Sequence, residues 1–174
     1  MEKELTYESI AKKIDHSLLG PSLTDRELEA GCRLAADYQV ASVCIKPHGV
    51  ALASRILEGT GVEVGTTVGF PLGGHATAVK MFEAQRAIAD GATELDMVIN
   101  IGWAIGGQWE QVASEIRAVT EAAHEGGAVI KVIFENCHLD DAQKIRLCHI
   151  CGEAGADYVK TSTGYGTGGA TIDD

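Results

Sequence analysis

The chain has 174 residues with 25 acidic and 14 basic side chains, so its formal net charge is −11. This acidic balance argues against a surface for nucleic acid or for an anionic membrane, and no apolar run approaches the ~18 residues that a membrane span needs. The charged start of the chain is unlike a secretory signal, and five cysteines lack the spacing of a disulfide framework. We therefore expect one cytoplasmic domain over residues 1–174, with reduced thiols.

Six β-rich runs are spaced along the chain. They cover residues 13–18, 41–45, 62–68, 94–99, 129–134 and 158–161. A Gly-Val or Gly-Ala pair precedes four of these runs, and glycine just after a helix is a common joint between the helix and the next strand. The intervals between these pairs match the length of one strand–helix–strand step. The pattern predicts a chain built from repeated strand–helix units.

Helical patterns occupy the gaps between the β-rich runs. We expect helices over 24–37, 47–57, the region of 81–88, 109–123 and 140–151. Thr24 with Glu27 predicts a capping box at the start of the first helix, and Thr171 with Asp174 predicts a similar helix start near residue 174. Alternating strands and helices indicate a parallel sheet, either doubly wound or closed as a barrel.

The two faces of the expected strands distinguish these alternatives. In the fourth run Leu95 and Asp96 fall on opposite faces, and in the fifth run Val132 and Lys131 do the same. Strands covered by helices on both faces would be apolar throughout, whereas barrel strands turn apolar residues outward and polar residues inward. We predict an α/β fold of the TIM (β/α)8 barrel class. Such a barrel needs about 250 residues, so we expect it to be truncated after about six strands, without the seventh and eighth.

Three charged residues on inward strand faces are candidates for chemistry. Lys160 lies late in the sixth run. Burial lowers the pKa of lysine side chains in general, and a lysine that loses its proton near neutral pH is a nucleophile toward carbonyls. Alternatively, this lysine extends to solvent or pairs with a carboxylate. Asp96 and Lys131 could transfer protons and shape the charge of a site, or they could form a buried ion pair that only satisfies itself.

Two further patterns are open to a functional and a structural interpretation. The glycine-rich segment 164–169 could hold a phosphate with its backbone N–H groups, or it could be a flexible connection. Cys148 and Cys151 lie on one expected helix without a second pair at zinc-site spacing, so we expect them, and Cys137, to be core thiols and predict no metal site. We expect His16 to orient a neighbour through a hydrogen bond and not to act as a catalyst.

Six short motifs stand at the expected strands, in one order along nearly the whole chain. They are KIDHSLL at 13–19, SVCI with Pro47 at 42–47, VGFPLG at 68–73, ELDMVIN at 94–100, KVIFE at 131–135 and VKTSTG at 159–164. In this order they resemble the deoxyribose-phosphate aldolase family, and the last motif is the most specific. The resemblance implies reversible, metal-free cleavage of 2-deoxy-D-ribose 5-phosphate to acetaldehyde and D-glyceraldehyde 3-phosphate, with no cofactor. It implies that Lys160 forms a Schiff base and that Asp96 transfers protons through water.

The resemblance also implies roles for residues around this centre. Asp15 and Lys131 would line the substrate site, and Thr163 and Gly164 would bind the substrate at the phosphate loop. Family members continue through a seventh strand with a second active-site lysine and an eighth that completes the phosphate site, so we expect this chain alone to be weakly active or inactive. Unpaired strand edges favour pairing with another chain, and we expect a homodimer.

Two other functions remain as alternatives. A phosphosugar isomerase would use Asp96 as a base and Lys160 only as a fixed charge. A non-catalytic phosphate-binding module would bind a ligand without forming a covalent bond to it. In all three cases the partners are small molecules, and neither nucleic acid nor a membrane is expected.

Overall fold

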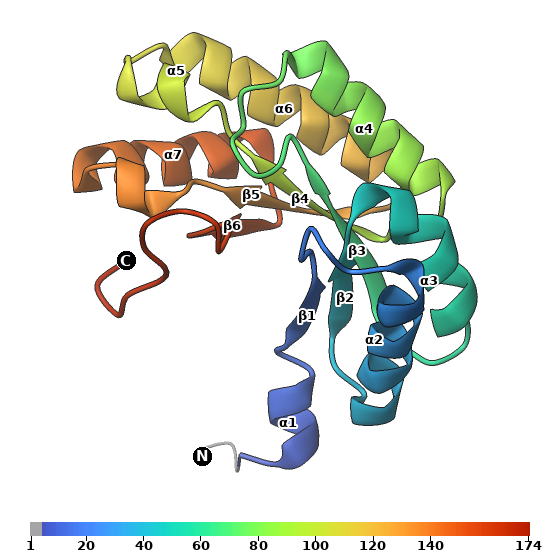
Figure 1. Cartoon of the computed structure of the whole chain (residues 1–174). Helices are drawn as coiled ribbons and strands as arrows, with labels where there is room; N and C mark the ends of the chain where they lie inside the picture. Colours follow the sequence, from blue (N-terminus) through green and yellow to red (C-terminus); the bar gives the residue numbers. More distant parts are fainter. Residues whose placement is uncertain (1–4) are drawn as a thin grey trace.

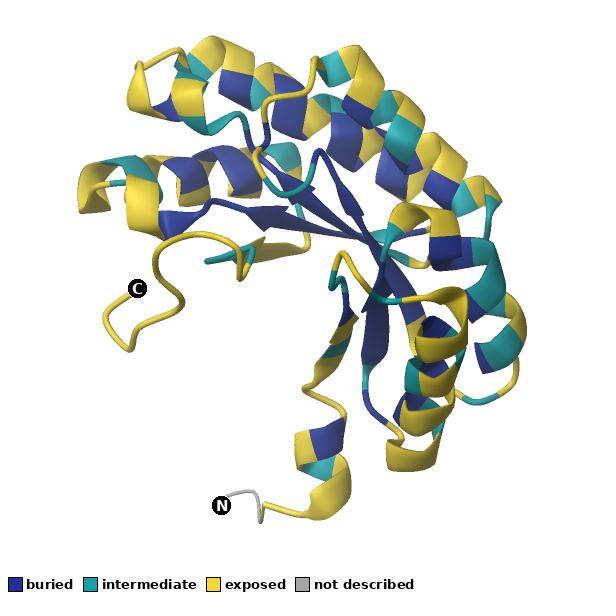
Figure 2. Ribbon diagram, in the orientation of Figure 1, coloured by how far each residue is buried: buried dark blue, intermediate teal, exposed yellow. Residues whose placement is uncertain are grey.

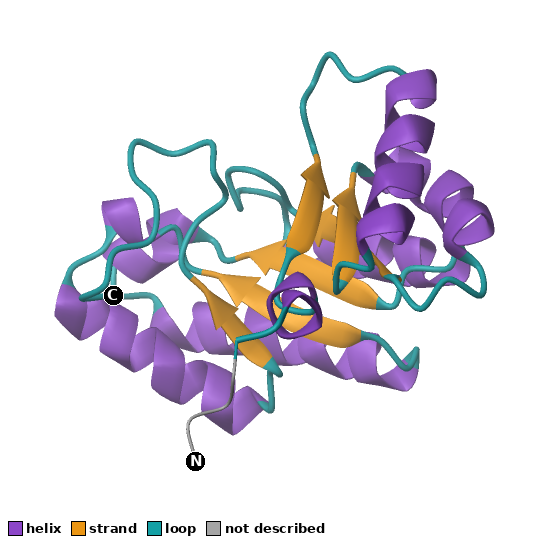
Figure 3. Cartoon of the chain, turned by 90° about the horizontal axis from the view of Figure 1, so that it is seen from below, coloured by secondary structure: helices purple, strands orange, loops and turns teal. Residues whose placement is uncertain are grey.

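A curved, parallel six-stranded sheet organises residues 5–174, which are the residues that this computed structural model describes. The strands are β1 (Asp15–Leu18), β2 (Ser42–Ile45), β3 (Glu63–Val68), β4 (Glu94–Val98), β5 (Val129–Ile133) and β6 (Tyr158–Lys160). Each strand pairs with its neighbours in the sequence, in the order β1-β2-β3-β4-β5-β6. The sheet curls strongly from one edge to the other (Figure 3). The predicted barrel-class α/β architecture is confirmed.

The main helices lie along the outer side of this sheet (Figure 1). They are α2 (Asp25–Tyr38), α3 (Val50–Leu57), α4 (Thr77–Ala89), α6 (Trp109–Glu125) and α7 (Asp141–Ala154). The segment after β6 loops back beside α7 (Figure 1), where Asp174 lies 2.7 Å from Lys144. Four shorter segments were not predicted as separate elements: α1 (Tyr7–Ala11), α5 (Ile101–Ile105) and the 3-10 turns η1 (Pro47–Gly49) and η2 (Asn136–His138). The hydrogen bonds of the capping box predicted at 171–174 are present, because Thr171 N donates to Asp174 Oδ2 and Asp174 N donates to Thr171 Oγ1.

The core lies between the outer face of the sheet and the helices. Leu95 and Met97 of β4 and Val132 of β5 are fully buried there, as the alternation of their strands predicts. Helix α6 contributes a stripe at helical spacing that includes Val112 and Ile116, both without exposed surface. Burial of such side chains stabilises the fold by about 1.5–3 kcal/mol each. Because apolar residues point outward, the inner face is free for polar side chains.

The two edge strands differ from the four central ones. All residues of β2 are buried, whereas β1 and β6 are largely exposed (Figure 2). Within residues 5–174, β1 pairs only with β2 and β6 only with β5. The inner face of the sheet is therefore reached from the side between β1 and β6.

A fully buried ion pair fixes the end of the central strand β4. Lys80 of α4 lies 2.9 Å from Glu115 of α6, and neither side chain has exposed surface. The Lys80 ammonium also donates to the carbonyl of Val98 at the end of β4, at 2.7 Å. Glu115 accepts from the backbone N–H of Asn100, at 2.9 Å. The pair thereby holds the segment that follows β4, two to four residues beyond Asp96.

Candidate active site

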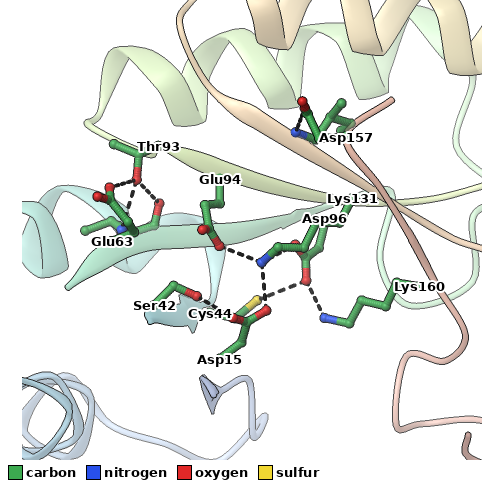
Figure 4. Close-up of polar contacts among 12 residues, drawn as sticks. Asp15, Ser42, Cys44, Glu63, Thr93, Glu94, Asp96, Lys131, Asp157 and Lys160 are labelled. Atoms are coloured by element: carbon green, nitrogen blue, oxygen red, sulfur yellow. Dashed lines mark hydrogen bonds and ion pairs between the residues drawn. The ribbon is translucent and has the colours of Figure 1, made fainter. Parts of the chain in front are cut away.

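Strand register brings the predicted inward-facing charges together. Asp96 of β4 stands directly opposite Lys131 of β5, and Lys160 of β6 stands opposite Ile133, two residues further along β5. Side chains two residues apart share a face of a strand, so all three project from the inner face. Figure 4 shows the two lysines converging on Asp96 from neighbouring strands. The structure thus brings together three of the predicted site residues.

Lys131 is enclosed by carboxylates. Its ammonium lies 2.7 Å from Asp15, 2.5 Å from Glu94 and 3.5 Å from Asp96. Burial alone would lower the pKa of Lys131, but the charge of Asp96 and the hydrogen bonds to Asp15 and Glu94 raise it above the ordinary value. Lys131 is therefore a permanent positive charge at neutral pH and a poor nucleophile.

Asp15 joins β1 to this cluster from the far edge of the sheet. Ser42 Oγ donates to Asp15 Oδ1 at 3.0 Å, which orients the carboxylate toward Lys131. Burial opposes ionisation of Asp15, yet the hydrogen bond and the charge of Lys131 together hold its pKa below the ordinary value. Asp15 is thus an ionised carboxylate whose charge is directed at Lys131.

Lys160 has a different environment from Lys131. Its ammonium contacts Oδ2 of Asp96, whose side chain is only 1% exposed. The Lys160 side chain is 35% exposed, against 11% for Lys131. A cavity of about 450 Å³ is lined by Lys160, Lys131 and Asp15 and lies between the edge strands. Of the two lysines, Lys160 is the one that a ligand in this cavity can reach more freely.

Cys44 closes the inner side of the cluster. Its sulfur lies 3.9 Å from Asp96 Oδ2. Burial and the nearby charge of Asp96 raise the pKa of the Cys44 thiol to about 12, so the thiol is neutral at physiological pH. Small side chains such as Cys44 and Ser42 on β2 leave room for the longer lysines opposite them.

Thr163 and Gly164 lie in the turn directly after β6. Thr163 donates its backbone N–H to Glu135 at 3.1 Å, and its hydroxyl donates to the other oxygen of the same carboxylate. Gly164 has a φ of +83°, which glycine adopts without the steric cost of a Cβ atom. The ring of Tyr165 packs edge-on against Phe70 at 5.5 Å. The turn is therefore ordered by contacts and is not a loose connection.

Other predictions from the sequence require correction. His16 points to the outer side, where it lines an apolar groove with residues such as Leu34, and within residues 5–174 its ring makes no hydrogen bond. Its expected orienting role is therefore wrong, because β1 turns Asp15 inward and the next residue outward.

Cys151 is buried as expected, but Cys137 and Cys148 are exposed. Helix α7 packs Leu147, Ile150 and Cys151 against the sheet, which leaves Cys148 outside that stripe.

Several residues of the site were missed by the sequence analysis. Glu94 falls on the inward face of β4 by the same alternation that placed Asp96, and this was the available signal. Glu135 continues the alternation of its run beyond Ile133, the last residue of β5, where its φ is +57°. Lys80 and Glu115 occupy positions on the apolar stripes of their helices, which is the only sequence sign of a buried charge pair.

Within the described residues, no group of three His, Cys, Asp or Glu side chains could hold a metal ion. No helix over 5–174 is long and apolar enough to cross a membrane.

Comparison with known proteins agrees with this geometry. Residues 9–173 match the family model described as DeoC/LacD family aldolase. The chain belongs to this family. The deoxyribose-phosphate aldolase of Rhodopirellula baltica is 56% identical over 168 residues, which are 97% of this chain and 70% of that protein. The deoxyribose-phosphate aldolase of Caldanaerobacter subterraneus is 49% identical over 175 residues, 100% of this chain and 76% of that protein.

A solved structure shows that this aldolase-family member shares the fold as well as the sequence. The deoxyribose phosphate aldolase of Aeropyrum pernix, described as a unique tetrameric structure, superimposes with a TM-score of 0.86 at 36% identity. The match covers 92% of this chain and 67% of that one. The family resemblance expected from the six sequence motifs is therefore confirmed.

Proposed function

We propose that this aldolase-family chain carries the reaction centre for reversible cleavage of 2-deoxy-D-ribose 5-phosphate, through a Schiff base on Lys160. The observation that carries the proposal is the unequal environment of two lysines beside one buried carboxylate. Lys131 is bound by three carboxylates and remains an ammonium. Lys160 contacts Asp96 and is about a third exposed beside the cavity. A nucleophilic lysine must reach the carbonyl carbon of the substrate, and Lys160 is the more exposed of the two lysines.

The proposed reaction starts when the Lys160 nitrogen adds to the aldehyde carbon of the open-chain sugar, and loss of one water leaves a protonated imine. Removal of the proton from the C3 hydroxyl then breaks the C2–C3 bond. The electron pair of that bond moves toward the imine nitrogen, which gives an enamine and releases D-glyceraldehyde 3-phosphate. Return of one proton to C2 and addition of one water release acetaldehyde and the free amine. The imine lowers the barrier because its nitrogen accepts the electrons of the breaking bond.

Asp96 is the group that we propose for proton transfer in these steps. One carboxylate oxygen contacts the Lys160 nitrogen, so it can accept the proton that the ammonium must lose. Asp96 is 1% exposed, and a water admitted with the substrate would carry protons between its carboxylate and the reacting carbon. Lys131 places a fixed positive charge 3.5 Å from the other oxygen, which supports charge balance during the transfer.

Substrate binding is proposed at two places, the cavity beside Lys160 and the turn that follows β6. Asp15 and Lys131 line the cavity and would contact the polar groups of the sugar. Gly164 and its neighbours would hold the phosphate through backbone N–H groups, a common mode of phosphate binding. Both hydrogen-bond donors of Thr163 are directed to Glu135, so Thr163 would contribute through the position of the turn.

The open edges of the sheet support two further proposals about the 174-residue chain on its own. Lys160 lies on edge strand β6, where Tyr158 and Val159 are 60% and 50% exposed, so water reaches the proposed reaction centre. We propose that turnover by this chain alone is slow, below the ~1 s⁻¹ at the lower end of typical enzymes. The exposed edges of β1 and β6 also favour self-association, and light scattering of the purified chain should show a dimer or larger species.

The direct test is acetaldehyde formation from 2-deoxy-D-ribose 5-phosphate, followed by a coupled alcohol dehydrogenase assay. We expect slow but measurable formation by the chain, none above background with Lys160→Met, and a reduced rate with Lys131→Met. Arg117→Met, which removes an exposed cation of α6, is the matched control and should keep the parent rate. Acetaldehyde formation that survives Lys160→Met would overturn the Schiff-base proposal, and conversion of the sugar to an isomer without acetaldehyde would indicate an isomerase.

A further inference from the structure

Glu135 is a buried acidic residue in an unfavourable backbone conformation. It follows β5 directly, its φ is +57°, and only 3% of its surface is exposed. A left-handed conformation costs free energy for any residue with a Cβ atom, and burial of a carboxylate costs more unless it is hydrogen-bonded. Non-glycine residues in such conformations cluster at functional sites. Glycine at this position would avoid both costs, so the Glu135 side chain must provide a compensating interaction.

That interaction is with the turn after β6. Oε1 of Glu135 accepts the Thr163 N–H at 3.1 Å, and Oε2 accepts the Thr163 hydroxyl. The Thr163 hydroxyl oxygen in turn accepts the N–H of Tyr165 at 3.0 Å. The turn also closes around the carboxylate, because a Cβ atom added to Gly166 would lie 3.0 Å from the Glu135 carboxyl carbon. Glu135 is thus the centre around which residues 163–166 are wound.

The far side of the turn is fixed by a second set of contacts. The Tyr165 hydroxyl donates to the carbonyl of Leu19 at 2.9 Å, and its ring packs on Phe70. Within residues 5–174, the N–H groups of Gly164 and Gly166 donate to no other protein group. The turn is held at Thr163 and Tyr165 while the two glycine amides remain available.

We infer that Glu135 is a positioning residue for the substrate phosphate. By binding both donors of Thr163 it sets the conformation in which the free N–H groups of Gly164 and Gly166 can bind a phosphate together. The two hydrogen bonds from Thr163 also stabilise the buried Glu135 carboxylate. The inference rests on the proposed function, since it takes segment 163–166 as the phosphate site.

The test is a titration of the ¹⁵N-labelled 174-residue chain with inorganic phosphate, followed at the Gly164 and Gly166 amides. In Glu135→Gln the amide keeps one acceptor oxygen and loses the other, and we expect the phosphate Kd to rise about tenfold, or about 1.4 kcal/mol. If Glu135 acted through its charge alone, the same substitution would strengthen phosphate binding, because it removes a negative charge. The sign of the change therefore separates the two roles. Glu121→Gln, at an exposed position of α6, is the matched control and should leave the Kd unchanged.

A second pair of variants covers the case in which Glu135→Gln does not fold. Thr163→Val removes the hydroxyl donor and should weaken phosphate binding, whereas Thr163→Ser keeps the hydroxyl and should restore it. An unchanged or tighter Kd in Glu135→Gln, equal affinity of Thr163→Val and Thr163→Ser, or no phosphate binding by the parent chain would each overturn the inference.

A parallel measurement separates this inference from the proposed function. Borohydride reduction with acetaldehyde labels Lys160 without any phosphate, so labelling should be equal in Glu135→Gln and in the parent. A large loss of labelling in a folded Glu135→Gln variant would overturn the positioning role, because it would show a general disturbance of the site. Failure of labelling in the parent itself, with phosphate binding and its dependence on Glu135 intact, would overturn the Schiff base and leave the positioning role supported.

Discussion

The buried ion pair between α4 and α6 leads to a sharp prediction for stability. Substitution of Lys80 by Met removes the ammonium but keeps an unbranched side chain of similar length in a site without exposed surface. The Glu115 carboxylate then keeps its hydrogen bond from Asn100 but loses the charge 2.9 Å away, and the Val98 carbonyl loses its donor. The substitution therefore leaves one charge and one carbonyl buried without their partner.

The expected cost follows from this arrangement. Breaking a buried pair by removal of one partner destabilises proteins by about 3–5 kcal/mol, whereas replacement of both partners by apolar residues is often neutral. Burial already lowers the pKa of Lys80 and raises that of Glu115, so each group depends on the other to stay charged. With total stabilities of about 5–15 kcal/mol for ordinary domains, the single substitution removes a large share of the free energy of unfolding. The double variant Lys80→Met with Glu115→Leu should recover most of it.

Urea unfolding followed by circular dichroism measures these differences. A slope of about 2 kcal/mol per molar urea converts the expected loss into a fall of the midpoint by about 2 M for Lys80→Met. The double variant should unfold at a midpoint closer to the parent than to the single variant. A fall of the urea midpoint by less than about 0.5 M in Lys80→Met would refute the free-energy cost assigned to breaking the pair. Equal midpoints for the single and double variants would refute it as well.

Two further predictions concern positions around the sheet. Gly69→Ala should lower the free energy of unfolding by about 2 kcal/mol or more, because Gly69 has a φ of +65° and an added Cβ atom would lie 2.6 Å from Lys80 Cε. Gly61→Ala is the control, because Gly61 has a φ of +76° but an added Cβ atom would meet no other atom within 4 Å. In urea unfolding, Gly61→Ala should cost only about 1 kcal/mol. Burial would raise the pKa of Asp157, but the Ile130 N–H and His124 hold it below the ordinary 3.8, so the unfolded chain binds more protons and stability falls as the pH drops through and below that value. Asp157→Asn should lower the thermal midpoint at pH 7 and flatten its decline toward pH 3, and an unchanged acid profile would contradict this assignment.

Much of the site could be predicted from the period of the strands. Because side chains alternate strictly along a strand, Asp96 and Lys131 could be placed on the inner face, and their direct pairing follows once β4 and β5 are adjacent. Lys160 needed more than alternation. Its strand is short and at an edge, and the family motif around it, not its burial pattern, made it the strongest candidate for the nucleophile.

The parts that were missed depend on contacts between distant segments. Glu135 lies beyond the last residue of β5 in a left-handed conformation, which no local pattern in a glutamate predicts, and its partner Thr163 is 28 residues away. Lys80 and Glu115 fall on the apolar stripes of their helices, but charged residues are rarely buried without a partner, so neither position alone predicts a buried charge. Only the packing of α4 on α6 shows that each provides the partner of the other.

The most direct test of the central claim is to identify the lysine that condenses with an aldehyde. The purified chain is incubated with acetaldehyde, reduced with borohydride, digested and analysed by mass spectrometry, with Lys160→Met and Lys131→Met treated in parallel. We predict one ethyl group on the peptide that contains Lys160, its loss in Lys160→Met, and its persistence at a reduced level in Lys131→Met. Labelling of Lys131 in preference to Lys160, or no lysine labelled above the level of exposed surface lysines in the folded chain, would contradict the account.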